Sequence, residues 1–480
     1  MRHASEMGHT RDVGTATAAA AGTSGRATGG ARDLAASQNI AATISPLRAA
    51  LRDLSTVEER GRITEALGPL VKAVGVQARI GELCELRTRD KILRAEVIGL
   101  RGSTLILTPF GDLSGLSTET EVVALRCGFT VPSGPALLGR VLDGFGTPID
   151  GGPALMDCPR VPVDADRPPP LSRRRVHQLC ETRVRAIDAL LPIGRGQRVA
   201  VVAPVGAGKT TLMGMLARGT RADVNVIALV GERSREVGEF VQQTLGPEGL
   251  KRSVVVVSTA DRSAAERAKS AQVATAIAEG FRREGRHVLL LMDSITRYVR
   301  ALREIGLASG EAPTRRGFPP SVFAALPRLL ERAGNDDCGE MTAFYTLLVE
   351  GDEANDPIAE EVRSLLDGHL HLSHEQAQAH QFPAIDILAS LSRVMPAIAS
   401  RAQLDAAARI RRWLGKHRDI EMLVQMGEYR SGADAEADEA IARLPRIREF
   451  LRQTPDDFSS SEQTRDALMK LVAPTGRADE

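Results

Sequence analysis

Between residues 176 and 394 the chain alternates short apolar runs with longer stretches of mixed polarity. Continuous apolar runs are typical of strands that are buried on both faces of a parallel sheet. The longer stretches, such as residues 264–283, are amphipathic and predict helices that cover the sheet. The runs that predict strands are residues 199–203, 226–230, 254–257, 288–292 and 343–349. We therefore expect an α/β domain over residues 176–394.

The patterns on either side of this domain are different. Residues 68–134 contain short β-like segments at intervals of about 8–12 residues, separated by glycine, proline and aspartate, which predicts a small β-barrel. Residues 135–175 are rich in proline and glycine and predict a linker. Residues 395–480 alternate charged and apolar residues at helical spacing, which predicts a small helical domain.

The N-terminal 43 residues are rich in alanine, glycine, threonine and serine. This composition buries too little apolar surface to order the chain, so we expect residues 1–43 to be a disordered tail. We expect residues 44–67 to form a short helical lead-in to the barrel. The first residues lack the apolar core of a secretory signal, and no apolar run reaches the about 18 residues of a membrane span.

Composition and charge narrow the class of protein. Of the 480 residues, 43% are hydrophobic and 26% are charged, as in soluble globular proteins. The 62 lysines and arginines balance 61 acidic residues, which argues against a globally basic nucleic-acid binder. The five cysteines are scattered and form no CxxC pair, so we expect reduced thiols in a cytoplasmic protein rather than disulfides or a zinc site.

The segment APVGAGKTT (residues 203–211) follows a predicted strand and opens a helix-like run, which is the context of a phosphate-binding loop. Gly206 and Gly208 let successive backbone N–H groups point at a phosphate. Lys209 supplies a positive charge to the phosphates, and the Thr210 hydroxyl is placed to ligate Mg²⁺. The segment therefore predicts a nucleotide site that holds a nucleoside triphosphate and Mg²⁺.

One position of this loop departs from the strict motif, because Ala203 stands where the motif has glycine. The alternative interpretation is a glycine-rich turn that happens to contain a lysine. The residues that we expect to bind the nucleotide are Pro204, Val205, Gly206, Ala207, Gly208, Lys209, Thr210 and Thr211.

Two carboxylates follow apolar runs at positions that suit this chemistry. Asp293 comes directly after residues 288–292, and ligands of open α/β sheets bind at such strand ends, where it would hold a water of the Mg²⁺ shell. Glu232 closes a third apolar run and is the best candidate to polarise the attacking water. Each has an ordinary alternative: Asp293 as a plain strand end, and Glu232 as a solvated acid at the start of a helix.

Five long stretches together resemble one family. They are GQRVAVVAPVGAGKTTLMGMLARG, VGERSREV, MDSITRYVRALREIGLASGEAPTRRGFPPSVFAALPRLLERAG, TAFYTLLVEGDEANDPIAEEVRSLLDGHLHLS and FPAIDILASLSRVMP. The chain resembles the type III secretion ATPases, relatives of the catalytic subunits of rotary ATP synthases, over about residues 68–471. The resemblance implies a RecA-like P-loop domain with a parallel sheet, preceded by a small N-terminal β-barrel and followed by a small helical domain.

The resemblance also implies roles for residues of the site. Lys209 and Thr210 match the family's phosphate and Mg²⁺ residues, and Asp293 matches its Walker B acid. Glu232 matches the catalytic glutamate that orients water. In this family alanine is also usual where this chain has Ala203, so this departure from the strict motif does not argue against a phosphate loop.

Four more residues take their roles from the resemblance alone. Arg233 and Arg297 match arginines that approach the γ-phosphate. Phe382 matches the aromatic residue, more often tyrosine, that stacks on adenine; simple core packing is the alternative. Arg393 matches the arginine finger that reaches the nucleotide of the neighbouring subunit, with an intrachain ion pair as the alternative.

One departure from the family lies outside the phosphate loop. The family usually has Thr-Gly before the string that ends in Arg-Ala-Ile-Asp, whereas Arg183 follows Thr182 here. The change puts in doubt any special backbone conformation at Arg183. Every residue to which the resemblance assigns chemistry is nevertheless present, so we expect an active enzyme.

Alternative functions remain open at this point. They are the flagellar branch of the export ATPases, a catalytic subunit of a rotary ATP synthase, a non-catalytic nucleotide-binding subunit, and an RNA translocase of the Rho type. Residues 70–134 hold only two aromatic residues, Phe110 and Phe129, and eight basic against seven acidic residues, so they give an RNA-binding barrel little support. The retained Glu232 argues against a non-catalytic subunit.

The preferred interpretation is an ATP hydrolase of the injectisome that uses ATP and Mg²⁺ and forms a homohexamer with active sites at its interfaces. The resemblance implies a stator-like regulator at the N-terminus, a central stalk protein, export-gate membrane components and chaperone–substrate complexes as partners, and no nucleic acid. It implies a cytoplasmic protein that is peripheral at the inner membrane through these partners.

Overall fold

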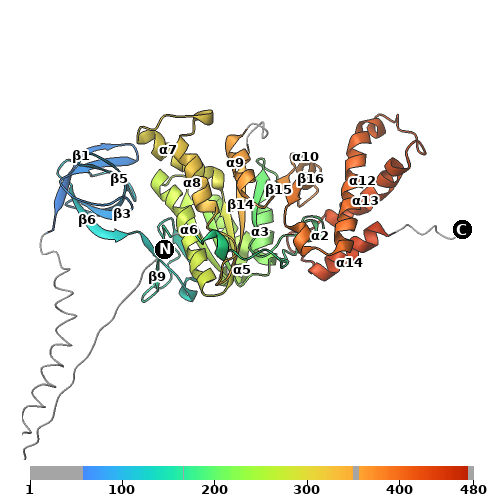
Figure 1. Cartoon of the computed structure of the whole chain (residues 1–480), viewed down its shortest axis with the longest axis horizontal. Coiled ribbons are helices and arrows are strands. Elements are labelled where there is room, and N and C mark those ends of the chain that lie inside the picture. Colours follow the sequence, from blue (N-terminus) through green and yellow to red (C-terminus); the bar gives the residue numbers. More distant parts are fainter. Residues whose placement is uncertain (1–57, 166, 350–355, 474–480) are drawn as a thin grey trace, which may run out of the picture. The chain divides into compact units, whose positions relative to one another are not determined.

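The structure is a computed structural model, and it describes residues 58–473 except residue 166 and residues 350–355. The described chain forms a barrel, a central α/β domain and a set of C-terminal helices in sequence order (Figure 1). The predicted fold class is thereby confirmed. The disordered tail that we expected over residues 1–43 lies outside the described residues, as do residues 44–57 of the expected helical lead-in.

Six antiparallel strands close the barrel in the order β1-β2-β5-β4-β3-β6. Their bounds are β1 (Arg60–Leu67), β2 (Leu70–Val74), β3 (Glu82–Arg87), β4 (Ile92–Arg101), β5 (Thr104–Pro109) and β6 (Glu121–Gly128). The alternating burial of these strands turns Val71, Leu86 and Leu107 into the barrel core. The expectation of helix was wrong for residues 60–67, because β1 pairs with both β2 and β6 and completes the barrel.

The central domain is built on an eight-stranded sheet in the order β16-β15-β10-β14-β13-β11-β12-β8. Its strands are β8 (Val141–Asp143), β10 (Arg198–Ala203), β11 (Val224–Glu232), β12 (Ser253–Thr259), β13 (His287–Asp293), β14 (Glu340–Leu348), β15 (Gly368–Leu372) and β16 (Ile385–Ser392). All neighbouring strands run parallel except β15 and β16. The parallel order places the carboxyl ends of β10, β13 and β11 at one edge of the sheet.

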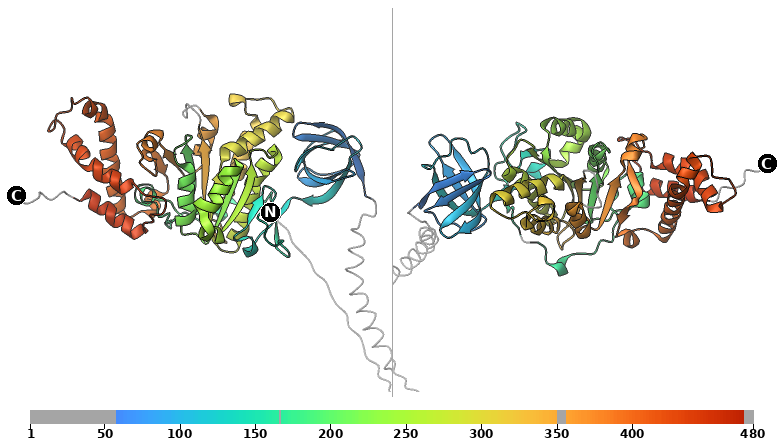
Figure 2. Two further views of the ribbon diagram at one scale, coloured as in Figure 1. Left: turned by 180° about the vertical axis from the view of Figure 1, so that it is seen from behind. Right: turned by 90° about the horizontal axis from the view of Figure 1, so that it is seen from above.

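Helices cover both faces of this sheet (Figures 1 and 2). Helices α6 (Ala264–Arg283), α7 (Ile295–Ala308) and α8 (Pro320–Leu330) share one apolar core with the sheet. Helix α3 (Lys209–Gly219) and a π-helical turn (Phe240–Leu245) pack in a second core on the other face. The shorter helices are α2 (Arg185–Leu190), α4 (Ser234–Glu239), α5 (Gly246–Lys251), α9 (Pro357–Leu365), α10 (His374–Gln378) and α11 (Met395–Ile398).

The C-terminal part consists of helices α12 (Arg401–Gln425), α13 (Ala435–Leu451) and α14 (Ser461–Val472). The side chains of Ser400, Asp434 and Ser460 cap their N-termini, which stabilises each start by about 1 kcal/mol. Their apolar faces join the same core as α3, so the helices pack onto the central domain. None of the helices among the described residues combines the length and the apolar character that a membrane crossing needs.

The proline- and glycine-rich region between barrel and central domain is more structured than the expected linker. It contains β8, which pairs with β12 at the edge of the central sheet. It also contains β9 (Arg160–Pro162), which pairs with β7 (Thr130–Pro132). The expectation of a plain linker over residues 135–175 was therefore wrong for these strands.

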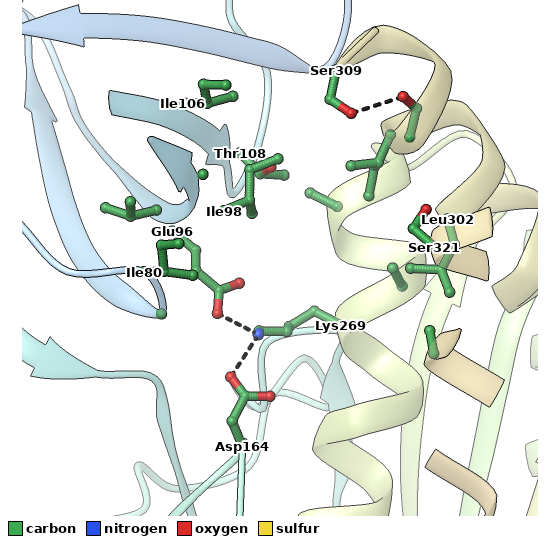
Figure 3. A pocket seen from close by; sticks show the side chains of 18 of the residues that line it. Ile80, Glu96, Ile98, Ile106, Thr108, Asp164, Lys269, Leu302, Ser309 and Ser321 are labelled. Atoms are coloured by element: carbon green, nitrogen blue, oxygen red, sulfur yellow. Dashed lines mark hydrogen bonds and ion pairs between the residues drawn. The ribbon is translucent and has the colours of Figure 1, made fainter. Parts of the chain in front are cut away.

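A buried ion cluster joins the barrel to helix α6 (Figure 3). The Lys269 ammonium of α6 lies 2.8 Å from Glu96 of β4 and 3.5 Å from Asp164. Lys269 and Glu96 are both largely buried, and burial raises the pKa of Glu96. The cluster closes one end of a cavity of about 590 Å³ whose walls combine aliphatic and polar side chains.

Candidate functional site

The predicted phosphate loop lies between the end of β10 and the start of α3. Gly206 and Gly208 have φ angles of +83° and +81°, in the left-handed region that favours glycine. Val205 is 74% exposed, and Thr210 and Thr211 are exposed as well. The loop thus lies partly exposed at the N-terminus of an 11-residue helix, where anions bind favourably.

Three charged side chains that the sequence predicted for the site lie together beside this loop. The Lys209 Nζ atom lies 2.5 Å from Asp293 Oδ1 and 3.5 Å from Glu232 Oε1. Asp293 ends β13 and Glu232 ends β11, which is the adjacent strand. Because both strands are parallel to β10, their ends and the loop meet at the same edge of the sheet.

Burial and charge give Glu232 an unusual acidity. Burial raises the pKa of Glu232 to about 7, and the neighbouring charge of Asp293 acts in the same direction. Lys209 and Arg297 oppose this effect. Burial lowers the pKa of Lys209, but the charges of Asp293 and Glu232 outweigh burial and hold that pKa above its usual value. A carboxylate whose pKa is near neutrality is suited to orient a water molecule and to share its proton.

Asp293 has a second partner that the sequence analysis missed. The Thr346 hydroxyl of β14 donates a hydrogen bond of 2.7 Å to Asp293 Oδ1. The motif that contains Asp293 gives no sign of this contact, because the two residues are separated by 53 positions and meet only through strand pairing.

The two predicted γ-phosphate arginines differ in their surroundings. Arg297 stands in the first turn of α7 and packs against the backbone of Gly231, where an added Cβ would lie 3.0 Å from Cβ of Arg297. Its Nε atom is buried and has no hydrogen-bond partner among the described residues. Arg233 is 79% exposed and lies 3.7 Å from Glu236. The structure therefore brings Arg297 to the cluster and leaves Arg233 at the surface.

Phe382 also lies at the phosphate loop. A Cβ atom placed on Gly208 would lie 3.3 Å from a ring carbon of Phe382. The Phe382 carbonyl accepts a hydrogen bond of 2.9 Å from the backbone N–H of Gln453, which ties this segment to the C-terminal helices. The ring is only partly buried, so one face is available to a flat ligand beside the loop.

Arg393 stays apart from the cluster within one chain. It follows β16 at the edge of the sheet and is exposed. Its guanidinium contacts the carbonyl oxygen of Arg363 at 3.5 Å, and its backbone N–H donates to the carbonyl of Asp367. The Arg393 side chain is therefore exposed and makes no contact with the charged cluster of its own chain among the described residues.

The oxygen donors of this site fit Mg²⁺. The Thr210 hydroxyl and the Asp293 carboxylate supply hard oxygen ligands beside a loop shaped for phosphate. Mg²⁺ is usually held by one or two such side chains together with phosphate oxygens and water. These two residues would hold the ion directly or through its waters.

Comparison with known proteins matches three parts of the chain to family models. Residues 183–392 match the nucleotide-binding domain of the ATP synthase alpha/beta family. Residues 63–126 match the beta-barrel domain of the same family. Residues 399–470 match the model described as the T3SS EscN ATPase C-terminal domain.

Whole-chain relatives agree with these matches. The chain is 56% identical to a type 3 secretion system ATPase of Xanthomonas euvesicatoria, over 88% of this chain and 96% of the relative. It is 50% identical to one of Sinorhizobium fredii, with coverage of 90% and 96%. A flagellum-specific ATP synthase of Bacillus subtilis is 44% identical, with coverage of 86% and 95%.

A solved structure shares the fold. The assembled ATPase EscN of the enteropathogenic E. coli type III secretion system superimposes with a TM-score of 0.82 at 45% identity, covering 86% of this chain and all of that one. EscN in complex with its central stalk EscO superimposes with a TM-score of 0.80 at 44% identity, and the match covers 86% of this chain and 100% of EscN.

Proposed function

The chain belongs to the type 3 secretion system ATPases. From this membership we propose that six copies of the chain form a ring, which hydrolyses ATP at its subunit interfaces to energise protein secretion. One observation carries the shared site. Lys209, Glu232 and Asp293 form a compact cluster, whereas Arg393 is exposed at the edge of the sheet. A second subunit that presents Arg393 to this cluster would add a positive charge beside the phosphates that the cluster binds.

Each residue has a defined task in this proposal. The backbone of the phosphate loop and the Lys209 ammonium bind the phosphates of ATP. Glu232 orients the attacking water and accepts hydrogen bonds from it. Mg²⁺, held through Thr210 and Asp293, neutralises negative charge on the phosphates when it is bound.

The arginines and Phe382 complete the site. Arg297, and Arg233 after a movement of its exposed side chain, approach the γ-phosphate. Arg393 of the neighbouring subunit neutralises the charge that spreads over the transferring phosphoryl group, an effect that increases rates by about 10³–10⁵ in other enzymes. Phe382 stacks on the adenine ring.

The partners follow from the same membership. A central stalk would contact the apolar residues exposed near the end of α12, which are Met422, Leu423, Val424 and Met426. We assign a stator-like regulator to the N-terminal segment, which lies outside the described residues. Export-gate components would hold the ring at the inner membrane from the cytoplasmic side, and chaperone–substrate complexes would be its cargo.

Mixing two inactive variants tests the shared site. Arg393→Ala and Lys209→Ala should each lose ATP hydrolysis alone. Their equimolar mixture should recover up to about a quarter of the parent rate, because one interface in four pairs an intact loop with an intact finger. Phosphate release and ring formation by mass photometry are the measurements.

A matched mixture provides the control. Lys209→Ala and Glu232→Gln damage residues that come from the same subunit of each interface. Every interface in a ring that mixes these two variants therefore lacks either Lys209 or Glu232. The pair must therefore stay at background. Mixed rings of Arg393→Ala and Lys209→Ala that stay at the same background would overturn the shared site.

A further inference from the structure

The hydroxyl of Thr346 occupies a position that the known motifs do not explain. It is fully buried on β14 and donates a hydrogen bond of 2.7 Å to Asp293 Oδ1. The same carboxylate oxygen receives the Lys209 ammonium at 2.5 Å. We propose that Thr346 is a positioning residue that holds the Asp293 carboxylate in place for the Mg²⁺–nucleotide complex. This proposal rests on the ATP hydrolysis proposed above.

The pairing of β13 with β14 brings these two side chains together. Met292 lies opposite Tyr345 in the parallel register, so the next residues of the two strands, Asp293 and Thr346, are neighbours. Alternation places Thr346 on the same side of β14 as Phe344, which belongs to the core shared with α3. The phosphate loop leads into α3, so Thr346 lies on the face of the sheet that α3 covers, which is the face on which the loop lies.

A buried hydroxyl needs a partner, and here the partner is a functional carboxylate. Thr346 Oγ1 has one other acceptor nearby, the carbonyl oxygen of Met292 at 3.3 Å. Leaving a buried hydroxyl or carboxylate without its hydrogen bond costs about 1–3 kcal/mol. The short contact with Asp293 therefore fixes the rotamer of both side chains.

The contact gains importance when Lys209 binds phosphate. Lys209 cannot keep its full interaction with Asp293 while it neutralises a phosphate. Among the described residues, Thr346 is then the remaining side-chain donor to Asp293. Both donors use Oδ1, which leaves Oδ2 of the carboxylate available for the Mg²⁺ shell.

The opposite end of the strand supplies a matched control. Thr342 is also fully buried on β14, on the same side as Thr346. Its hydroxyl accepts a hydrogen bond of 2.9 Å from the Gly196 N–H and contacts His287 Nε2 at 2.9 Å. Thr342→Val removes a buried hydroxyl of the same strand without touching Asp293.

The experiment compares Thr346→Val, Thr346→Ser and Thr342→Val with the parent. The dissociation constant of a fluorescent ATP analogue is measured with and without Mg²⁺, and ATP hydrolysis gives kcat and KM. We expect Thr346→Val to bind the metal-free analogue as the parent does and to lose about 10–100-fold of the Mg²⁺-dependent gain in affinity. Because the weakened complex is the one that reacts, KM for Mg²⁺–ATP should rise by a similar factor, and kcat should fall as well.

The controls separate positioning from stability. Thr346→Ser keeps the hydroxyl and should restore the Mg²⁺-dependent gain to within about threefold of the parent. Thr342→Val should lower the unfolding temperature and leave that gain unchanged. If Thr346→Val does not fold, Thr346→Ala takes its place, because the smaller side chain introduces no new contact.

The outcomes distinguish the two proposals. An unchanged Mg²⁺-dependent gain in folded Thr346→Val or Thr346→Ala would overturn the role of Thr346, whatever the rate of hydrolysis. Failure of Thr346→Ser to restore the gain would also overturn it. A parent protein that binds the analogue and does not hydrolyse ATP would contradict the proposed function instead.

Discussion

Glu232 shows how much of the chemistry depends on one side chain and its surroundings. It lies at a strand end that the sequence predicts, but its pKa near 7 comes from burial and from Asp293, which is remote in sequence. An isolated glutamate would be fully ionised and solvated at neutral pH. The folded site turns the same carboxylate into a group that can exchange a proton with water.

Replacing Glu232 with glutamine should abolish hydrolysis without abolishing binding. Glutamine keeps the shape and removes the charge, so we expect phosphate release to fall by at least about 10²-fold. Affinity for ATP should be retained, because Lys209 and the loop are unchanged. Phosphate release and binding of a fluorescent ATP analogue are the measurements. The control is Glu239→Gln, which alters an exposed ion pair with Arg235 and should leave the rate unchanged. Equal rates of hydrolysis for Glu232→Gln and the parent would remove Glu232 from the mechanism.

Asp188 predicts a pH dependence of stability. Burial raises its pKa from 3.8 to about 7, although Thr182 and the Arg183 N–H donate hydrogen bonds to it. The folded protein therefore binds more protons than the unfolded chain between these two values, and stability falls as pH rises through this window. The parent should lose about 3 kcal/mol more than Asp188→Asn between pH 5 and pH 8.

Urea unfolding of the nucleotide-free proteins at the two pH values measures this difference. The asparagine variant has no proton to lose at position 188, so its own change reports all other groups. Parallel changes in the parent and the variant would contradict the raised pKa of Asp188.

At the level of elements, the start of α2 contains the departure from the family. Arg183 has a φ angle of +63°, in the region where a residue with a Cβ is strained. Glycine, the usual residue of the family here, adopts this conformation without strain. The Arg183 guanidinium lies 5.4 Å from the centre of the Phe458 ring, which adds a cation–π contact between the central domain and the C-terminal part.

Two small substitutions at Arg183 separate backbone strain from side-chain contacts. Arg183→Gly and Arg183→Ala both lose the contact with Phe458, but only glycine relieves the strain. We expect Arg183→Gly to be more stable than Arg183→Ala by about 1 kcal/mol. Equilibrium urea unfolding measures the difference, and an alanine variant at least as stable as the glycine variant would contradict the explanation.

The elements themselves were predictable to different degrees. Helix α6 covers the predicted residues 264–283, and the five predicted strands correspond to β10 to β14. These strands are buried on both faces, so their apolar runs are continuous. Strands β15 and β16 were missed because polar residues, such as His369 and His371 in β15 and Asp386 and Ser390 in β16, interrupt their apolar residues. Strand β1 was missed because six of its eight residues are exposed and only Gly61 and Ile63 are buried.

At the scale of the whole molecule, Lys269 links the central domain to the barrel, because this residue of α6 pairs with Glu96 of β4. Lys269→Met leaves Glu96 buried without its cation, and we expect a loss of about 3 kcal/mol in unfolding free energy. Hydrogen exchange should increase in β4 and α6. Adding Glu96→Leu to Lys269→Met should recover most of the loss, because the uncompensated charge is removed.

A surface lysine gives the comparison. Lys251 pairs with Glu248 at an exposed position, so Lys251→Met should change stability by less than about 0.5 kcal/mol. A Lys269→Met variant that behaves like Lys251→Met would show that the buried cluster does not hold the barrel to α6.

The sequence alone determined the chemistry of the phosphate loop, because its glycines, lysine and threonine are contiguous and follow a buried strand. It also determined the fold class, because buried strands, amphipathic helices and the barrel segments have different periodicities. Only the tertiary structure decided which side chains meet the loop. Thr346 reaches Asp293 through strand pairing, Phe382 reaches Gly208 through a distant turn, and Arg393 lies at an exposed edge. Such contacts depend on sheet order and register, which local patterns of residues do not encode.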